Sequence, residues 1–216
     1  MKKIASPLFQ DLSEAELDTL AAAGHLRTRQ FAKHEVIFRA GSRVREIGIV
    51  LRGSVHIENL DLWGTKSILS SVGAGQAFAE TYAFCGEALM VDAVAAEHCE
   101  ILFLHTAAFT DARIEPALQD KLLRRLLAVS MRKNLSLSQR IFCTTPKTVR
   151  GRLLTYFSAQ AARCGRMEFE VPFNRQQMAD YLNLDRSALS KELCKMRDEG
   201  LLEFDKNRFV LKQLPE

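Results

Sequence analysis

The sequence predicts an α+β protein with a many-stranded N-terminal domain, a long central helix, and a C-terminal domain of short helices and a hairpin. Three observations predict this fold class. Short apolar runs typical of strands recur between residues 26 and 104, and turn residues separate them. A leucine-rich helical pattern follows, from about Pro116 to Ile141. Further on, two helix starts stand on either side of a three-residue turn, and an alternating segment comes after them.

The first expected element is a short helix. Ser13 and Glu16 have the spacing of a capping box, in which each side chain bonds the backbone N–H of the other residue. Leu12 and Leu17 stand at the positions of the accompanying hydrophobic staple. Because glycine ends helices easily, Gly24 predicts that this helix stops near Ala23.

The segment from Leu26 to Leu104 contains strand patterns with turn signals between them. A parallel sheet needs crossover helices, so their absence favours an antiparallel sandwich or barrel. The expected strands are Val36–Phe38, Ile47–Leu51, Val55–Asn59, Ser67–Ser71, Val91–Ala95 and Ile101–Leu104.

A corner of small residues, 75–80 (GQAFAE), leads into an expected helical turn at Thr81–Phe84. Glu80 is a carboxylate among small residues, so it can bind a hydroxyl group of a ligand. It can also be exposed to solvent or cap neighbouring amides, and the residues alone leave these alternatives open.

The long helix carries more than one apolar stripe in its first half. One stripe can pack on the sandwich and leave another for a second copy of the helix, which predicts a homodimer. The alternative is a helix fully buried in a monomer. The apolar residues are Leu118, Leu122, Leu123, Leu126, Leu127, Val129 and Met131.

A break follows at Cys143-Thr144-Thr145-Pro146, and we expect a domain boundary and hinge at Thr144–Pro146. With Thr145 as N-cap and Pro146 in the first turn, a new helix is predicted to run to about Arg163, with Gly165 just past its end. A strand is expected within Met167–Phe173.

The segment from Asn174 to Leu202 predicts two helices joined by a tight turn. Asn174 with Gln177 forms a capping box, and Asp185 is the N-cap candidate of the second helix. The turn is Leu182-Asn183-Leu184, in which Asn183 suits a positive φ.

The second helix has one apolar face and one polar, basic face. Leu189, Leu193 and Met196 form a stripe that can face the first helix, while short polar and basic groups point away from it. This arrangement suits a helix-turn-helix that reads DNA, although a generic helical pair with a solvated face is the alternative. The candidate DNA-binding residues are Asn174, Arg175, Gln176, Arg186, Ser187, Ser190 and Lys191.

The alternating segment Glu203–Leu211 around Asp205-Lys206-Asn207 predicts a β-hairpin, which makes a winged helix the better interpretation. Charge agrees with a polyanion partner. Residues 1–112 contain 10 lysines and arginines against 14 acidic residues, whereas residues 113–216 contain 20 against 12. A basic C-terminal half therefore holds the predicted helix-turn-helix.

Several classes of protein are excluded. No apolar run is long enough for a membrane helix or a signal peptide, so no membrane association and a cytoplasmic location are expected. The five cysteines show neither Cys-x-x-Cys spacing nor an even number, which argues against a disulfide framework or a zinc site, and we expect most of them to be buried or inert thiols. No catalytic grouping, metal site or phosphate loop is present, so an enzyme is not expected.

Several short segments match one known family in order and spacing. They are Pro7-Leu8-Phe9, Val36-Ile37-Phe38 with Gly41, Leu51-Arg52-Gly53, residues 75–80, the long helix, residues 186–191 and Glu199-Gly200-Leu201. Together they resemble the CRP/FNR family of bacterial transcription regulators over nearly the whole chain.

The resemblance implies a sensor jelly roll of the cyclic-nucleotide-binding type (1–112), a dimerisation helix (113–143) and a winged helix-turn-helix DNA-binding domain (144–216). It implies a homodimer that binds a palindromic operator in double-stranded DNA, RNA polymerase as a further partner, and control by a small-molecule effector. A ligand-sensing module that acts through protein contacts, with weak or no specific DNA binding, is the alternative function.

The effector site departs from the cAMP-binding members of the family. There an Arg-Ser pair holds the cyclic phosphate, and the corresponding positions here are Met90 and Val91. An apolar pair cannot neutralise a phosphate, so we expect no physiological cAMP binding, although Glu80 matches the ribose-binding glutamate. The expected pocket accepts a small apolar or aromatic effector or is filled by core side chains. Its residues are Phe78, Ala79, Glu80, Tyr82, Phe84, Met90 and Val91.

Two further departures concern cofactors and DNA. The N-terminal cysteine cluster of iron–sulfur members is absent and the histidines show no haem pair, so no cofactor is expected, with a single axial histidine left open. In the recognition helix the family usually has Glu where this chain has Ser187 and Arg where it has Lys191. We therefore expect a half-site different from the familiar one.

Overall fold

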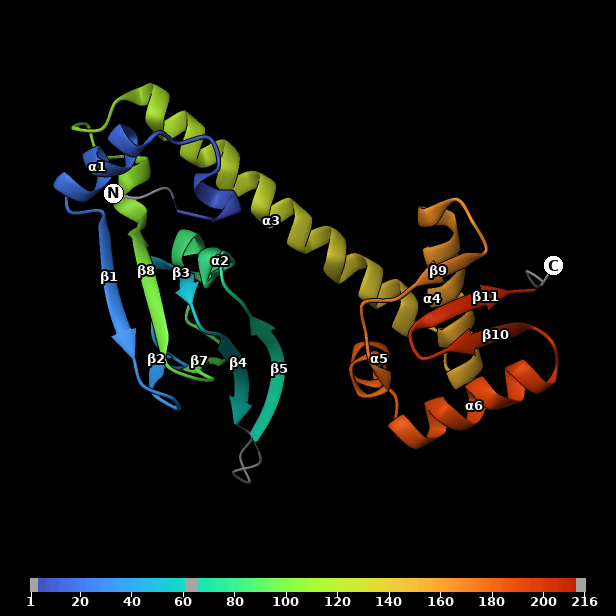
Figure 1. The fold of residues 1–216 in the computed structure, drawn as a ribbon. Helices are drawn as coiled ribbons and strands as arrows, with labels where there is room; N and C mark the ends of the chain where they lie inside the picture. Colours follow the sequence, from blue (N-terminus) through green and yellow to red (C-terminus); the bar gives the residue numbers. More distant parts are fainter. Residues whose placement is uncertain (1–3, 61–65, 213–216) are drawn as a thin grey trace. The chain divides into compact units, whose positions relative to one another are not determined.

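The computed structural model describes residues 4–60 and 66–212, and it divides into two compact units between Arg132 and Lys133 (Figure 1). The first unit contains the strands of the predicted sandwich, and the second contains the predicted winged helix. The elements of the first unit are η1 (Pro7–Phe9), α1 (Glu14–Ala22), β1 (Leu26–Phe31), β2 (Val36–Phe38), β3 (Glu46–Arg52), β4 (Val55–Leu60), β5 (Lys66–Val72), β6 (Ala77–Phe78), α2 (Glu80–Cys85), β7 (Asp92–Ala95), β8 (Cys99–His105) and η2 (Thr106–Phe109).

A single helix, α3 (Pro116–Thr144), contributes residues to both units. The remaining elements of the second unit are α4 (Val149–Cys164), β9 (Glu168–Glu170), α5 (Arg175–Leu182), α6 (Arg186–Asp198), β10 (Leu202–Asp205) and β11 (Arg208–Leu211).

The N-terminal strands form two antiparallel four-stranded sheets, which confirms the predicted sandwich. Their strand orders are β1-β8-β3-β6 and β2-β7-β4-β5. The sheets enclose an aromatic core in which the ring of Phe38 lies 5.7 Å from that of Phe78 and 5.6 Å from that of Phe103. All six expected strands are present, Val36–Phe38 with the expected bounds and the others with ends shifted by at most two residues.

Strand β1 was missed because its sequence, LRTRQF, lacks an alternating apolar pattern and residues 27–30 are all exposed. In this strand arginine side chains, in place of apolar ones, cover aromatic rings of the core. The Arg27 guanidinium lies 4.8 Å from the centre of the Phe103 ring, and that of Arg29 lies 4.5 Å from the Phe31 ring. Strand β6 has only two residues, too few for a pattern.

The capping box of α1 is present, with Ser13 Oγ 3.2 Å from the Glu16 amide and Glu16 Oε2 2.8 Å from the Ser13 amide. Helix α2 also begins near the predicted place, one residue earlier than expected. Ala79 precedes it with φ 61°, a left-handed conformation that costs a non-glycine residue about 1 kcal/mol. On the neighbouring strand, a side chain at Gly48 would overlap the ring of Phe78. The Phe78 ring therefore packs directly on the backbone of Gly48.

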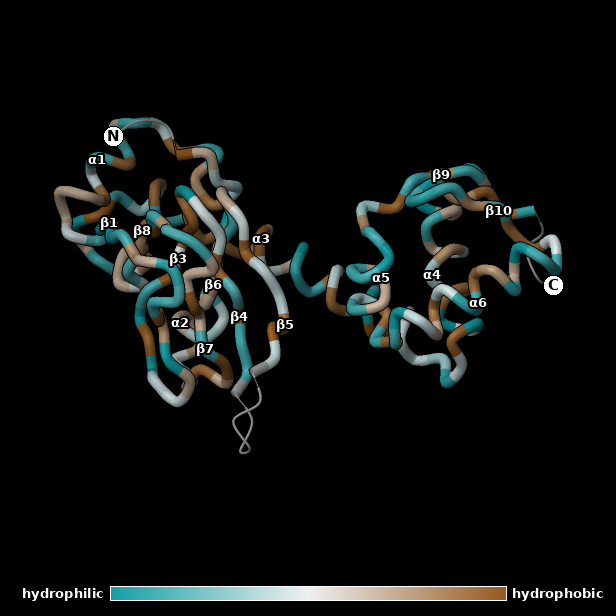
Figure 2. The backbone as a smooth tube through the Cα atoms, turned by 60° about the horizontal axis from the view of Figure 1, so that its bottom comes forward, coloured by the Kyte–Doolittle hydropathy of each residue, from teal (hydrophilic) through white to brown (hydrophobic). Residues whose placement is uncertain are grey.

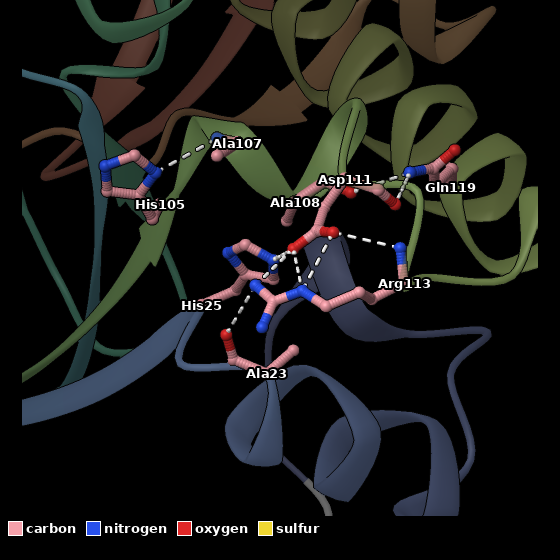
Figure 3. Close-up of polar contacts among 8 residues, drawn as sticks. All are labelled: Ala23, His25, His105, Ala107, Ala108, Asp111, Arg113 and Gln119. Carbon is pink, nitrogen blue, oxygen red and sulfur yellow. Dashed lines mark hydrogen bonds and ion pairs between the residues drawn. The ribbon is translucent and has the colours of Figure 1, made fainter.

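A polar cluster holds the segment that leads into α3 (Figure 3). The carboxylate of Asp111 lies 2.7 Å from His25 Nε2 and accepts a hydrogen bond of 2.6 Å from Arg113 Nη2. Gln119, in the first turns of α3, donates to the Asp111 carbonyl at 2.9 Å. The Arg113 guanidinium, with a smaller contribution from His25, holds the pKa of Asp111 well below its usual range. The segment before α3 is therefore held to the residue that precedes β1 by a hydrogen bond.

Helix α3 has one buried and one exposed apolar stripe, as predicted. Leu118, Leu122 and Leu126 are buried in the core that also contains residues of η1 and α1. On the other stripe Leu127 has 55% of its surface exposed. The further exposed apolar residues of the helix are Leu123, Met131, Leu135, Leu137, Ile141 and Phe142.

The predicted start of the next helix is wrong. Thr145 is not an N-cap, because its hydroxyl donates to the Ile141 carbonyl at 2.8 Å and so completes the end of α3. The N-cap is Thr148, whose Oγ1 accepts from the Gly151 amide at 3.0 Å, and α4 begins at Val149. The end is as expected, with Gly165 at φ 66° after Cys164.

The five cysteines divide between the core and the surface. Cys99 and Cys143 are buried, but Cys85, Cys164 and Cys194 are exposed, and none of the five is in a disulfide. Cys85, Cys164 and Cys194 lie on the exposed sides of helices α2, α4 and α6, and the residue type alone does not show on which side of a helix a cysteine falls.

The second unit has the connectivity of a winged helix. Strands β10 and β11 pair as an antiparallel hairpin around Lys206 and Asn207, and β11 also pairs with β9. Phe157 of α4 packs on the hairpin, with its ring 4.6 Å from that of Phe209. Against this core lie α5 and α6, in which hydrophobic and hydrophilic residues alternate along the helix (Figure 2).

Candidate nucleic-acid interface

The start of α5 is fixed by the predicted capping box. Asn174 Oδ1 accepts from the Gln177 amide at 2.9 Å, and Gln177 Oε1 accepts from the Asn174 amide at the same distance. Gln176 is exposed, and its Nε2 donates to Asp180 Oδ1 at 2.9 Å. Because the first amides of a helix carry partial positive charge, this end of α5 suits a phosphate group.

The turn between α5 and α6 has the predicted geometry. Asn183 adopts φ 53°, and Asp185 begins α6 by accepting a hydrogen bond of 2.9 Å from the Ala188 amide. Asp185 also accepts a short hydrogen bond from the Ser187 hydroxyl. The Ser187 hydroxyl first, and then the Ala188 amide, lower the pKa of the Asp185 carboxyl.

Helix α6 separates into the two faces that the sequence predicts. Leu189, Leu193 and Met196 are fully buried in the same core as α5. On the outer side Arg186, Ser187 and Lys191 are exposed, whereas Ser190 is half-buried. The outer face thus offers two cationic groups and small hydroxyls, which can donate to and accept from base edges.

Arg150 lies on α4 and binds two glutamates at α6, a contact that the sequence did not predict. Its Nε donates to Glu192 Oε1 at 2.6 Å, and its two terminal nitrogens donate to Glu199 at 2.8 and 3.0 Å. The two glutamates stand seven residues apart, two turns along one face of α6. This spacing is the only signal in the sequence that could have pointed to the contact.

Arg175 lies differently from the other candidate residues. Its guanidinium is 4.9 Å from the centre of the Phe204 ring and 5.0 Å from that of Phe209, so it stacks on the wing. Its Nη1 is buried without a hydrogen-bond partner in the described part of the chain. Burial lowers the pKa of the guanidinium. A contact from Arg175 to phosphate therefore needs a change of its side-chain conformation.

A mainly apolar cleft of about 550 Å³ lies between the start of α5 and the tip of the wing. Lys206, at the hairpin turn with φ 48°, and Asn207 form its wing side. Asn207 is fixed there, because its carbonyl accepts from the Val171 amide at 2.9 Å. The other lining residues are Pro172, Phe173, Asn174 and Arg175.

The candidate effector residues do not form a single exposed surface. Phe78 is buried in the sandwich core, whereas Met90 has 77% of its surface exposed. Phe84 is exposed and lies edge-on to Phe109, with ring centres 5.6 Å apart. Glu80 is buried in the first turn of α2, which makes full solvent exposure the wrong alternative. The other three, Ala79, Tyr82 and Val91, are half-buried.

Within the described ranges no group of three or more His, Cys, Asp or Glu side chains could hold a metal ion. Over the same residues, no helix has the length and hydropathy needed to cross a membrane.

Comparison with known families assigns both halves of the chain. Residues 28–113 match the cyclic nucleotide-binding domain, and residues 151–216 match the Crp-like helix-turn-helix domain. The second match contains α5, α6 and the hairpin. No protein in a search of curated sequences matches the chain.

Solved structures of similar proteins agree with this family assignment. The catabolite activator protein of Thermus thermophilus is 25% identical, with a TM-score of 0.50, over 96% of this chain and 94% of that one. FixK2 of Bradyrhizobium japonicum is 19% identical, with a TM-score of 0.52, over 87% and 93%. The c-di-GMP-responsive global regulator CLP of Xanthomonas campestris is 18% identical, with a TM-score of 0.55, over 93% and 100%. The latter two show a shared fold.

A cyclic-nucleotide-binding-type domain followed by a Crp-like helix-turn-helix defines a transcription regulator, with a sensor-type domain and a DNA-binding domain, and not an enzyme. The chain belongs to the CRP/FNR family of these regulators.

Proposed function

We propose that this regulator works as a homodimer that binds a palindromic operator in double-stranded DNA and is controlled by a small-molecule effector through its N-terminal domain. The observation that carries the DNA part is the division of α6 into a fully buried stripe and an exposed face with Arg186, Ser187 and Lys191. A helix anchored on one side can enter the major groove with the other.

Each group of candidate residues has a separate role in this proposal. Arg186, Ser187, Ser190 and Lys191 contact base edges, where a lysine donates to guanine. A serine hydroxyl accepts from a base amino group, and it also donates when its proton is not already used within the protein. Asn174 and Gln176, and Arg175 once its side chain leaves the rings of the wing, contact the phosphate backbone at the start of α5, which fixes the position of the domain without reading sequence.

The exposed apolar stripe of α3 supports the homodimer. Seven large apolar side chains of this helix are exposed, and a second copy of the helix would cover them. Two-fold symmetry would then place two recognition helices on two half-sites of opposite direction. At the promoter such a dimer would help or hinder RNA polymerase, the further partner that we propose.

Selection from random duplex DNA by the purified protein, at two salt concentrations, tests the proposal. We expect an inverted repeat whose half-site centres lie about 10 bp apart or a multiple of that. Binding without a motif, lost as salt rises, would show phosphate attraction alone and would favour a module that acts through protein contacts.

For the effector we propose a small apolar or aromatic molecule instead of cAMP. The support is that Met90 and Val91 carry no charge where a cyclic phosphate would need one. Isothermal titration of the full chain with cAMP should give no binding up to about 1 mM. Saturable binding at micromolar cAMP would contradict this part of the proposal and leave the DNA part standing.

A further inference from the structure

The last turn of α5 has every carbonyl bound, and two arginines from outside the helix-turn-helix bind most of them. A helix ends with about four carbonyls that have no partner within it. The Ala179 carbonyl accepts from the Leu184 amide at 2.9 Å, as part of the turn itself. The next carbonyls, from Asp180 to Asn183, all receive guanidinium hydrogen bonds.

Arg140 supplies the first two of these bonds from α3. Its Nη2 donates to the Asp180 carbonyl and its Nε to the Tyr181 carbonyl, each at 3.0 Å. The guanidinium also lies 5.8 Å from the centre of the Tyr181 ring. Arg140 is half-buried, and the negative end of the helix dipole favours its charge there.

Arg152 supplies the other two bonds from α4. Its Nη1 donates to the carbonyls of Leu182 and Asn183 at 3.1 and 2.7 Å. Its Nε donates to the Pro146 carbonyl at 2.8 Å, which fixes the bend before α4. Arg152 thus closes the turn from within the winged helix, whereas Arg140 reaches the same turn from α3.

We propose that Arg140 is a positioning residue, through which α3 sets the orientation of the recognition helix for binding two half-sites at once. Its two bonds hold the end of α5 at a fixed place on α3, and the bound turn leads directly into α6. The inference rests on the proposed function, because α3 is the helix that we expect to pair with a second copy. It adds the residue that transmits the position of the paired helices to the DNA-reading surface.

The test compares four variants of the full chain on the operator selected by the wild type. Arg140→Met keeps the aliphatic stem and loses both bonds, and Arg140→Lys keeps the charge and can reach one carbonyl. Arg152→Met removes the neighbouring pair of bonds from α4. Arg132→Met is the control for loss of an exposed positive charge on α3. For each, affinity is measured for a duplex with one half-site and for inverted repeats of varied spacing.

For Arg140→Met we expect half-site affinity within about twofold of the Arg132→Met control, but affinity for the full operator weakened about tenfold. Its preference for one half-site spacing should also disappear. For Arg152→Met we expect half-site and operator affinity to fall together. If circular dichroism shows that Arg140→Met is unfolded, Arg140→Lys carries the test, with the same pattern at smaller size.

Several results would overturn the inference. Equal loss on half-site and operator would make Arg140 a helix cap like Arg152, and an unchanged spacing preference would show that it has no role in positioning. If the wild type itself selects no operator, the proposed function fails and takes the inference with it. An operator bound equally well by the wild type and by Arg140→Met contradicts the inference alone.

Discussion

At the scale of single residues, the outer face of α6 has a hydroxyl whose direction is already set. The Ser187 hydroxyl donates to the Asp185 carboxylate, so toward DNA it has only lone pairs to offer. It can therefore accept from the amino group of cytosine or adenine. Lys191 can only donate, and guanine is its natural partner in the major groove.

We predict that Lys191→Ala weakens binding to the selected operator by about 1–3 kcal/mol and removes the preference for one base pair. Lys195→Ala, one turn further along the same helix and also exposed, is the matched control. It should lower affinity for all sequences alike. Competition binding with operators changed at one position measures both effects, and an unaltered base preference in Lys191→Ala would place the reading surface elsewhere.

A second single-residue prediction concerns Tyr156, which is 1% exposed while its hydroxyl has no partner among the described residues. An unpaired buried hydroxyl is unfavourable, and burial raises the pKa of this phenol. Tyr156→Phe should leave stability unchanged or raise it by up to about 1 kcal/mol. Tyr156→Ala should lower it by about 3–5 kcal/mol. Urea unfolding compares them, and a clear loss in Tyr156→Phe would mean that the hydroxyl is bonded.

At the scale of elements, the start of α6 depends on the charge of Asp185. Its carboxylate bonds the Ala188 amide at the positive end of the helix, and its pKa is lowered in the folded state. A lowered pKa means that ionised Asp185 stabilises the fold at pH values above the unfolded pKa, about 3.9. That contribution is lost as the pH falls through the folded pKa.

We therefore predict that Asp185→Ala unfolds at lower urea than the wild type at pH 7, while Asp185→Asn, which keeps a capping oxygen, loses less. The difference between wild type and Asp185→Asn should shrink as the pH falls below about 4. Unfolding midpoints from pH 7 to pH 3 provide the measurement. A difference that stays constant over this range would show that charge at the cap has no effect.

Elements with a strong local signal could be predicted from the sequence, and those defined by distant contacts could not. Both capping boxes were recognisable because their partners stand three residues apart. Strand β1 was not, since it lacks an apolar alternation and the ring that Arg27 covers, that of Phe103, lies far along the chain. The start of α4 was misplaced because a threonine before proline reads as a cap, and only the folded chain shows Thr145 bonded backward to Ile141.

The same limit applies to the site. Residues on the outer face of α6 follow from helical periodicity once Asp185 is placed as a cap. Arg140, Arg150 and Arg152 do not, because two of them bind main-chain carbonyls that no residue type marks. The sequence places the basic residue Arg175 at the start of the helix-turn-helix, which predicts a phosphate contact. In the structure its guanidinium instead stacks on the rings of the wing.

At the scale of the whole molecule, the proposed function depends on a second copy of the chain that pairs with the exposed stripe of α3. We predict that Leu127→Glu, at a side chain 55% exposed, yields a monomer that keeps its fold and loses high-affinity binding to the inverted repeat. Charge on an exposed stripe should disturb a partner helix and leave the core intact. Sedimentation and circular dichroism test the two halves of this prediction.

Arg124→Glu introduces the same acidic side chain at an exposed position of the same helix that is already charged. It is the control and should remain a dimer. A dimer retained by Leu127→Glu would move the interface away from this stripe. An unfolded Leu127→Glu would contradict the prediction that a charge at this position leaves the core intact.

The bonds at the end of α5 also bear on how this regulator can change over evolutionary time. Arg140 and Arg152 bind carbonyl oxygens, which every amino acid provides. The side chains at Asp180 and Tyr181 can therefore be exchanged without removing the bonds that fix the turn. If α3 positions the recognition helix as proposed, a lineage could retarget its operators by substitutions in α5 and α6 while the bonds to α3 stay the same. New specificity would then not require a new mechanism of control.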